Sequence, residues 1–245
     1  MNEHSPLYAI VEIALAADIA EAKLPPGSQL PSEGRLIERF NVSRTTLRKA
    51  IENLVARGLV EIRRGKGTFV TQPKIVQELT SLTGFVEDMQ KSGRVPTARL
   101  LDKTVVTADA RVAGKLALPV GSDVMRIQRI RLADGIAISF DETYLPLDIG
   151  DKVVTHDLDA EPIFSLLEDK YDLPLTGAEY RLEAVIARPD VAAALMVDPG
   201  SAIFLIERTS YTRDSQPIDY ENLFYRGDMI SFVTHLARSP RPHSS

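Results

Sequence analysis

The run VSRTTLRKAIENLVARGLVEIRRGKGTFV, residues 42–70, restricts the possible folds more than any other part of the chain. Ser43 is a favoured helix N-cap, and Gly58 stands where glycine commonly ends a helix in the left-handed conformation. Between them the apolar residues recur at helical spacing: Leu47, Ala50, Ile51, Leu54 and Val55. Alternating apolar residues flank the basic tip RRGKG that follows. The run therefore predicts a capped helix and then a β-hairpin.

The residues before this run predict two further helices. Residues 6–22 have the apolar spacing of an amphipathic helix, and the segment LPPGSQLPSE interrupts that pattern. Ser32 is placed to cap a second helix that continues to Phe40. A short turn at 41–42 then leads into the capped helix described above. Two helices joined by a tight turn form the helix-turn-helix pattern.

Positive charge gathers in this part of the chain. Residues 33–70 contain nine lysines and arginines against four acidic residues, although the whole chain carries a net charge of −5. Arg44 and Arg48 lie at the start of the third helix, where cations oppose the helix dipole. Contact with a polyanion explains that unfavourable placement, and arginine at such a helix start can pair with guanine in the major groove. A wing on double-stranded DNA explains the basic hairpin tip in the same way.

The stretch from LPSEGRL to GKGTFV resembles the DNA-binding domain of GntR-family bacterial transcription regulators. The resemblance implies a winged helix-turn-helix domain over residues 1–72. The positions that it assigns to DNA contact, together with the arginine of the hairpin tip, are Ser43, Arg44, Thr45, Thr46, Arg48, Arg64, Lys66 and Gly67. Many members of the family have arginine directly after LPSE, where this chain has Gly34.

The remainder of the chain repeats itself. Residues 108–129 align with residues 187–208 at an offset of 79, and each copy predicts a short helix, a turn and an apolar strand that is followed by a return strand. Two such units in one antiparallel sheet, added to the N-terminal helices, predict an α+β protein. We expect a polar linker over residues 73–80 and a helix over residues 81–92.

The segments RIRLADG, DETYLP and YTRDSQPIDYENLFYRGD resemble the UTRA effector domain of the HutC subfamily, which is similar in fold to chorismate lyase. The resemblance implies an effector-binding and dimerisation domain over 81–239, with a tail over 240–245. It also implies a small-molecule pocket. The pocket residues expected from the resemblance and from the local pattern are Arg129, Arg131, Asp141, Phe164, Asp219, Tyr225 and Arg226.

Arg129 and Arg131 are two residues apart, so they share one face of a strand. Two neighbouring guanidinium groups suit a carboxylate or a phosphate. The alternative is that they only form ion pairs with Asp141, Glu142 or Glu207. Family members that take sugar phosphates tend to have SLY where this chain has PIF at 162–164. The loss of those hydroxyl groups favours a small organic acid.

The sequence indicates no catalytic centre. It has no cysteine, its four histidines lack metal-ligand spacing, and it contains no nucleotide-binding or hydrolase fingerprint. We expect neither metal nor cofactor, and the N-terminus predicts neither a signal peptide nor a membrane span. The resemblance to the family implies a repressor that its effector releases, and together with the observations above it favours a cytoplasmic homodimer that binds a near-palindromic operator and responds to an acidic metabolite. The alternative is a metabolite-binding protein or lyase-like enzyme whose helix-turn-helix contacts proteins.

Overall fold

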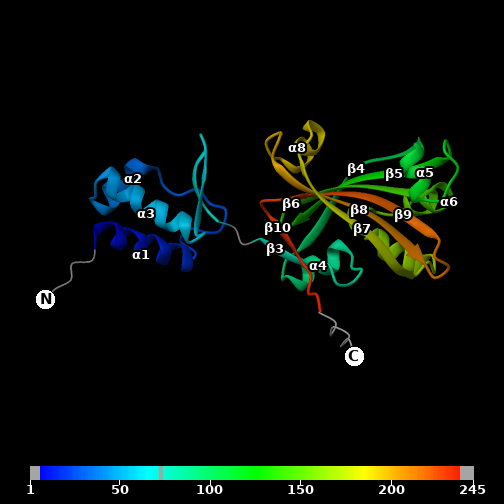
Figure 1. Cartoon of the computed structure of the whole chain (residues 1–245), viewed down its shortest axis with the longest axis horizontal. Coiled ribbons are helices and arrows are strands. Elements are labelled where there is room, and N and C mark those ends of the chain that lie inside the picture. The colour runs from blue at the N-terminus through cyan, green and yellow to red at the C-terminus, as the bar shows by residue number, and fades with distance from the viewer. Residues whose placement is uncertain (1–5, 72–73, 238–245) are drawn as a thin grey trace, which may run out of the picture. The chain divides into compact units, whose positions relative to one another are not determined.

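The computed structural model describes residues 6–71 and 74–237, which form two compact units. The first unit ends at residue 73 and the second begins at Lys74. Figure 1 labels α1, α2 and α3 of the first unit and most of the helices and strands of the second. Each unit is described here by itself. The tail expected over 240–245 lies outside the described residues.

The first unit is a winged helix-turn-helix, as predicted. Its elements are α1 (Leu7–Ala20), α2 (Glu33–Phe40), α3 (Arg44–Ala56), β1 (Val60–Arg63) and β2 (Gly67–Val70). Ser32 and Ser43 cap their helices by accepting hydrogen bonds from the backbone N–H groups of Arg35 (3.5 Å) and Thr46 (3.1 Å). Gly58 follows α3 with a φ of +69°, the left-handed conformation expected there. Residues from all three helices and both strands close one apolar core.

The hairpin is supported by a segment that we did not predict to join it. The backbone N–H of Leu30 donates to Thr68 O, and that of Val70 donates to Ser28 O, each at 2.8 Å. The Gln29 side chain donates to the carbonyl of Lys66 at 2.8 Å, which holds the hairpin tip. Gly67 adopts a φ of +120°, and a Cβ at this position would collide with the Gln29 amide. The backbone conformation favours glycine, and a Cβ here would also displace the end of the Gln29 side chain from the hairpin tip.

The second unit is built on one antiparallel sheet, as predicted. Its strands are β4 (Pro96–Thr107), β5 (Asp123–Ala133), β6 (Ile136–Pro146), β7 (Leu175–Ile186), β8 (Ala202–Thr212) and β9 (Pro217–Arg226), and their spatial order is β4-β5-β6-β9-β8-β7. The two copies of the repeat meet where β6 pairs with β9. The repeat is longer than the sequence indicated, because β4 and β7 begin and end at the same offset of 79 residues.

Helices cover both faces of this sheet, and Figure 1 shows α5 and α8 on one side and α4 on the other. One face packs against α5 (Ala110–Lys115) and α8 (Pro189–Leu195). The other face packs against α4 (Phe85–Lys91), α6 (Leu147–Val153), α7 (Ile163–Ser165) and the π-helical segment η1 (Leu166–Lys170). This second face carries the polar residues that are described below.

The prediction of a polar linker over residues 73–80 is wrong. Residues Ile75–Glu78 form the strand β3, which pairs in parallel with β10 (Ile230–Val233). Ile75 and Gln77 are buried while the residues between and after them are exposed, which is the alternation of a half-buried strand. The segment is short and partly polar, and its partner strand lies at the far end of the unit's sequence, so no local pattern revealed it. The helix expected over 81–92 begins only at Phe85, after the extended residue Gly84.

Candidate functional site

The first candidate site is the N-terminal half of α3, where the two predicted arginines lie side by side. Their side chains are 69% and 60% exposed for Arg44 and Arg48. Both approach Glu33 of α2, with Nε to carboxylate oxygen distances of 3.6 Å and 3.2 Å respectively. Thr45 is exposed beside them, and Thr46 bonds the capping Ser43 hydroxyl at 2.8 Å. A single carboxylate therefore holds two guanidinium groups at the start of the exposed helix.

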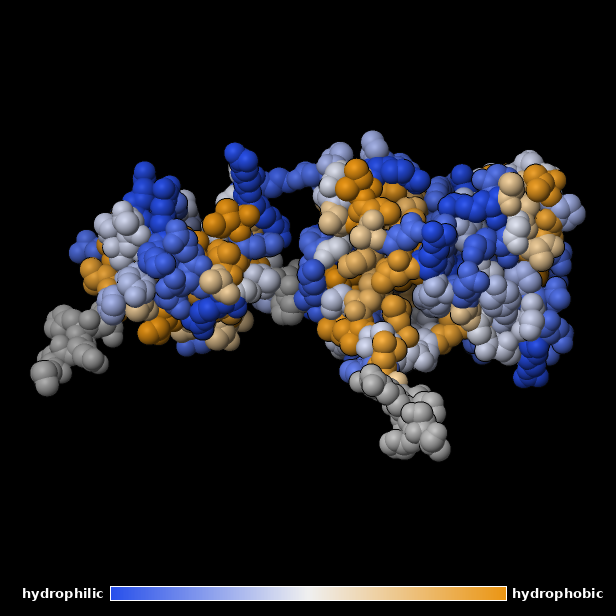
Figure 2. Space-filling view, in the orientation of Figure 1, coloured by the Kyte–Doolittle hydropathy of each residue, from blue (hydrophilic) through white to orange (hydrophobic). Residues whose placement is uncertain are grey.

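The wing borders the same surface. Arg64, Lys66 and Gly67 are exposed in the hairpin, and Figure 2 shows its tip as strongly hydrophilic. A groove of about 510 Å³ runs between the hairpin and the helices, and its lining includes Gln29, Glu33, Arg48, Ile51, Arg64 and Gly67. Of the predicted DNA contacts, Arg48, Arg64 and Gly67 line this groove, whereas Ser43, Arg44, Thr45, Thr46 and Lys66 do not. Such a surface suits double-stranded DNA, in which the anionic phosphate backbone lies beside base edges that side chains can contact.

Gly34 is the position where many family members carry arginine, and it offers a direct test of this surface. A Cβ built on Gly34 meets no atom within 4 Å, so a side chain can be added without strain. We expect Gly34→Arg to tighten binding to all DNA sequences and to steepen the salt dependence by about one unit, because it adds one phosphate-directed cation. Electrophoretic titration at several salt concentrations measures both effects. Gly34→Gln, which has length without charge, should leave the salt slope unchanged.

The second candidate site is a small cavity beneath the sheet face that α4 and α7 cover. Its volume is about 30 Å³, which is room for one or two water molecules. Its lining includes Gln77 of β3, Phe85 of α4, Arg129 and Arg131 of β5, Asp141 of β6, Phe164 of α7, Arg208 of β8, and Glu221 and Tyr225 of β9. Strands from both copies of the repeat therefore contribute charged groups to one cavity.

Two of the three arginines in the cavity are paired. Arg131 Nε donates to Asp141 Oδ2 at 2.9 Å, and the Ser139 hydroxyl donates to the other oxygen of that carboxylate at 2.6 Å. Arg208 forms a direct ion pair with Glu221. All of these side chains are almost fully buried, so each charge needs its partner.

Arg129 is the exception. Its side chain is fully buried, and none of its three nitrogens has a hydrogen-bond partner among residues 6–71 and 74–237. Burial and the neighbouring charge of Arg131 lower the pKa of Arg129 to about 9, so the group still carries its charge at neutral pH. The alternative of a purely structural ion pair therefore describes Arg131 but not Arg129. The cavity holds three guanidinium groups against the carboxylates of Asp141 and Glu221, which leaves one positive charge uncompensated.

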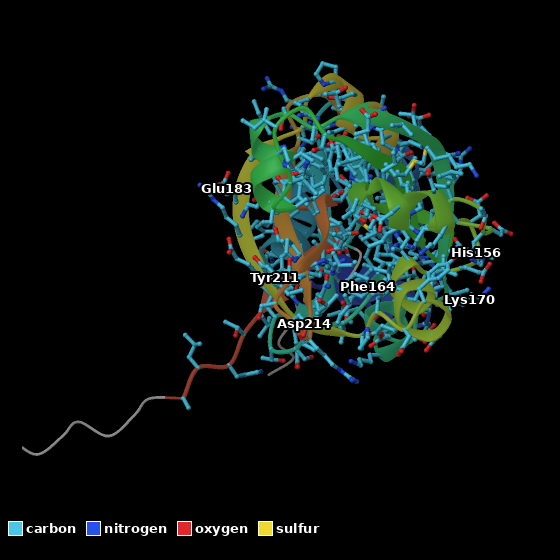
Figure 3. The ribbon with its side chains drawn as sticks, turned by 90° about the vertical axis from the view of Figure 1, so that its right-hand side faces the viewer. His156, Phe164, Lys170, Glu183, Tyr211 and Asp214 are labelled. Carbon is cyan, nitrogen blue, oxygen red and sulfur yellow. The ribbon has the colours of Figure 1, made fainter. Side chains whose placement is uncertain are left out.

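Aromatic rings close the cavity. The guanidinium carbon of Arg208 lies 4.4 Å from the centroid of the Phe164 ring, and that of Arg131 lies 5.6 Å from the centroid of the Phe85 ring. These are cation–π distances. Figure 3 shows Phe164 towards the middle of the unit, whereas His156 and Lys170 lie at its outer edge. A ligand larger than water fits beside Arg129 only if part of the cavity lining moves.

Two of the expected pocket residues do not line the cavity. Arg226 neighbours Tyr225 on β9 and so points to the opposite face, where it pairs with Asp228 at 2.7 Å. Asp219 is buried further along β9 and accepts a hydrogen bond from the backbone N–H of Ser210 at 3.0 Å. Burial, followed by the charge of Glu221, raises the pKa of Asp219 to about 7. The other expected residues, Arg129, Arg131, Asp141, Phe164 and Tyr225, lie together in the lining.

Sequence reasoning missed Arg208, Glu221, Gln77 and Phe85. A signal for Arg208 was present, since the offset of 79 that relates the two copies of the repeat places Arg208 at the position of Arg129. Glu221 then follows as the cross-strand partner of Arg208. Gln77 had no such signal, because it lies on the strand that the sequence did not indicate.

The described residues show neither a metal-binding cluster nor a membrane-spanning helix. Within the described ranges, 6–71 and 74–237, no group of three or more histidine, aspartate or glutamate side chains is arranged to hold a metal ion. In the same part of the chain no helix combines the length and the apolar character needed to cross a membrane.

Residues 7–70 match the family described as bacterial regulatory proteins, gntR family, and residues 91–231 match the UTRA domain. The chain is a GntR-family regulator of the HutC subfamily. The HTH-type transcriptional repressor NagR of Bacillus subtilis strain 168 is 32% identical to this regulator over 241 residues, which cover 97% of this chain and 98% of NagR. The histidine utilization repressor of Pseudomonas putida is 26% identical and spans 91% of this chain and 89% of its own length.

A solved structure supports the same assignment. The crystal structure of PhnF from Mycobacterium smegmatis matches this GntR-family regulator with a TM-score of 0.67 and 27% identity, covering 94% of this chain and all of that chain. These relatives and the two matched domains make the regulator a ligand-responsive DNA-binding repressor. The interpretation as a lyase-like enzyme has no such relative among them.

Proposed function

We propose that this regulator is a homodimeric repressor that grips its operator with the α3 arginines and the wing, and that a small organic acid held by Arg129 releases it. The observation that carries the proposal is the buried guanidinium group of Arg129, which has no hydrogen-bond partner among the described residues. A buried charge is costly unless it is paired. An anionic ligand supplies the missing partner. We assign the cavity no catalytic role and place the protein in the cytoplasm, with its DNA.

The charge balance favours a monoanion. Asp141 and Glu221 already offset two of the three guanidinium groups, so one negative charge completes the balance. A phosphate monoester brings close to two charges at neutral pH, whereas a carboxylate brings one. The rings of Phe85 and Phe164 beside the cavity favour an acid with a planar or apolar body.

Ligand entry must change the protein. The cavity of about 30 Å³ cannot contain even a small acid, so part of its lining, which includes Phe85 of α4 and Phe164 of α7, has to move. The ligand-bound and ligand-free arrangements therefore differ in the packing around the cavity. A ligand that stabilises one arrangement over the other can change operator affinity.

A homodimer is the expected assembly. One winged module buries limited surface on DNA, and tight specific binding commonly uses two half-sites. β7 is an edge strand of the sheet, and its Leu182 and Ile186 side chains are 41% and 73% exposed. Figure 2 shows hydrophobic surface near β10 and the adjoining part of the second unit. Light scattering should give the mass of two chains at micromolar concentration; a stable monomer that binds its operator one-to-one would contradict this expectation.

The proposed function is tested by operator selection followed by release. The full chain is used to select binding sequences from random duplex DNA, and the best sequence is titrated at fixed salt with and without each acid. Carboxylates of metabolites whose genes neighbour this one form the test set, and their phosphorylated counterparts form the control. We expect one carboxylate to lower operator affinity by about 5–150-fold. Release by phosphate esters alone would show that the ligand class is wrong.

A further inference from the structure

Gln77 links the cavity to the start of the second unit. It lies on β3, three residues after Lys74, where that unit begins. Its side chain is 8% exposed and lines the same cavity as Arg129. The residue thus belongs both to the ligand-facing wall and to the strand that continues the chain from the DNA-binding unit.

The side chain of Gln77 is held on one side only. Its Nε2 donates to Asp88 Oδ2 of α4 at 2.5 Å. Its Oε1 is buried without a hydrogen-bond partner in the described part of the chain. The Asp88 carboxylate also accepts a hydrogen bond from the Thr83 hydroxyl at 2.6 Å, so it keeps a partner if Gln77 turns away. A polar group with one unmet bond is expected to change partners readily when another charged group arrives.

A second set of contacts, made through β10, also connects β3 to the cavity. β10 is its only paired strand among the described residues, and Gln77 stands opposite Phe232 there. The Phe232 ring lies 5.4 Å, centroid to centroid, from the rings of both Tyr225 and Phe204. Tyr225 itself lines the cavity. A change of occupancy in the cavity therefore reaches β3 directly through Gln77 and indirectly through β10.

We propose that Gln77 couples the ligand to the DNA-binding unit: an anion on Arg129 draws the Gln77 amide away from Asp88 and thereby shifts β3. In this division of roles Arg129 supplies affinity for the anion, and Gln77 supplies the response. The proposal rests on the proposed function, because it takes the anion site at Arg129 as given.

The test uses an anion tethered to the protein, so that it does not need the natural ligand. Gln77→Glu in the full chain places a carboxylate of nearly the same shape in the cavity lining that residue 77 shares with Arg129. We expect this variant to bind the selected operator about tenfold more weakly than the wild type without any added acid. Gln77→Met, which removes the bond to Asp88 but adds no charge, should stay within about twofold of the wild type.

Two double variants separate attraction to Arg129 from repulsion by Asp88. Gln77→Glu with Asp88→Ala removes the repulsion without placing a hydrogen-bond donor beside the new carboxylate, and should keep the weakened binding; it also serves as the folded alternative if the single variant is unstable. Gln77→Glu with Arg129→Met removes the attraction and should bind the operator as Arg129→Met alone does. Circular dichroism and thermal unfolding check that each variant is folded.

The outcomes distinguish this proposal from the one on which it rests. If Gln77→Glu and Gln77→Met bind the operator alike, or if Arg129→Met fails to suppress the effect of Gln77→Glu, Gln77 is not the coupling residue. That result leaves the proposed function intact as long as carboxylates still release the wild type. If no carboxylate releases the wild type while Gln77→Glu is still suppressed by Arg129→Met, the coupling stands and the natural ligand class is wrong.

Discussion

Arg129→Met is expected to raise the free energy of unfolding of the ligand-free second unit by about 2–4 kcal/mol, because it replaces a buried unpaired charge by an apolar side chain of similar length. Most core substitutions destabilise a protein, so a gain of this size would be diagnostic. Urea unfolding, followed through the transition of the second unit, measures it. A variant less stable than the wild type would show that Arg129 has a partner in solution.

Arg208→Met is the matched control, since it applies the same substitution at the equivalent position of the repeat. Arg208 is paired with Glu221, and its removal leaves a buried carboxylate without that partner. We expect this variant to lose about 3–5 kcal/mol of stability. The two substitutions thus have opposite signs if only one of the arginines is a ligand site.

The gain in the free energy of unfolding that we expect from Arg129→Met depends on pH. The folded-state pKa of Arg129 is about 9, well below the ordinary arginine value that applies to the unfolded chain, because of burial and the neighbouring charge of Arg131. Below pH 9 both states carry the charge, and the folded state bears the full cost of burying it. Above pH 9 the folded state releases the proton first, so the cost declines. The difference between Arg129→Met and the wild type should therefore be constant near neutral pH and shrink above pH 9.

The same variant separates ligand response from DNA binding. Arg129 belongs to the second unit, whereas α3 and the wing belong to the first. Arg129→Met should therefore bind the operator as the ligand-free wild type does, and should no longer respond to the acid. A variant that responds fully would show that the acid binds elsewhere.

Arg44→Ala and Arg48→Ala are each expected to cost about 1–3 kcal/mol of operator binding and to relax base preference at one position of each half-site. Lys66→Ala should instead weaken binding to all sequences alike and lower the salt slope by about one unit. Arg57→Ala is the matched control, because this arginine follows α3 at its far end and pairs with Glu12. Unchanged operator affinity for Arg44→Ala would mean that α3 is not the recognition helix.

The shared carboxylate of Glu33 adds a second expectation. Arg44 and Arg48 both approach it, so removing one arginine leaves the other more firmly held and less available to DNA. Each single loss then includes a penalty at the neighbouring arginine. The double variant should consequently lose less than the two single losses added together. A double-variant cycle on the selected operator measures this difference.

The first unit could be predicted because its signals are local. Ser32, Ser43 and Gly58 mark helix ends through contacts within a few residues, and the structure has those ends where the sequence indicates them. Gln29 is different, since its bond to the Lys66 carbonyl joins residues 37 positions apart. No spacing rule along the chain connects two such residues.

The cavity could be predicted in part for the same reason. Arg129 and Arg131 share a strand face by simple alternation, and both line the cavity. Which of them is paired depends on partners from other strands, and the chain pattern does not fix that choice. Gln77 required knowledge that β3 pairs with β10 across the whole unit. Nonlocal pairing therefore underlies both the ligand charge that we propose and the coupling that we propose through Gln77.

The two copies of the internal repeat pair their arginines differently in the cavity. Arg129 stands opposite Asp141 on β6, as Arg208 stands opposite Glu221 on β9. In the first copy Asp141 forms its ion pair with Arg131. The second copy has Ser210 at the position equivalent to Arg131, so Arg208 remains paired with Glu221. One additional guanidinium group thus leaves Arg129 without the counter-ion that its equivalent in the other copy keeps, and this is the charge that we propose an anion meets. Competition for a counter-ion within one half of a repeat is therefore enough to give the two halves different roles in the proposed site.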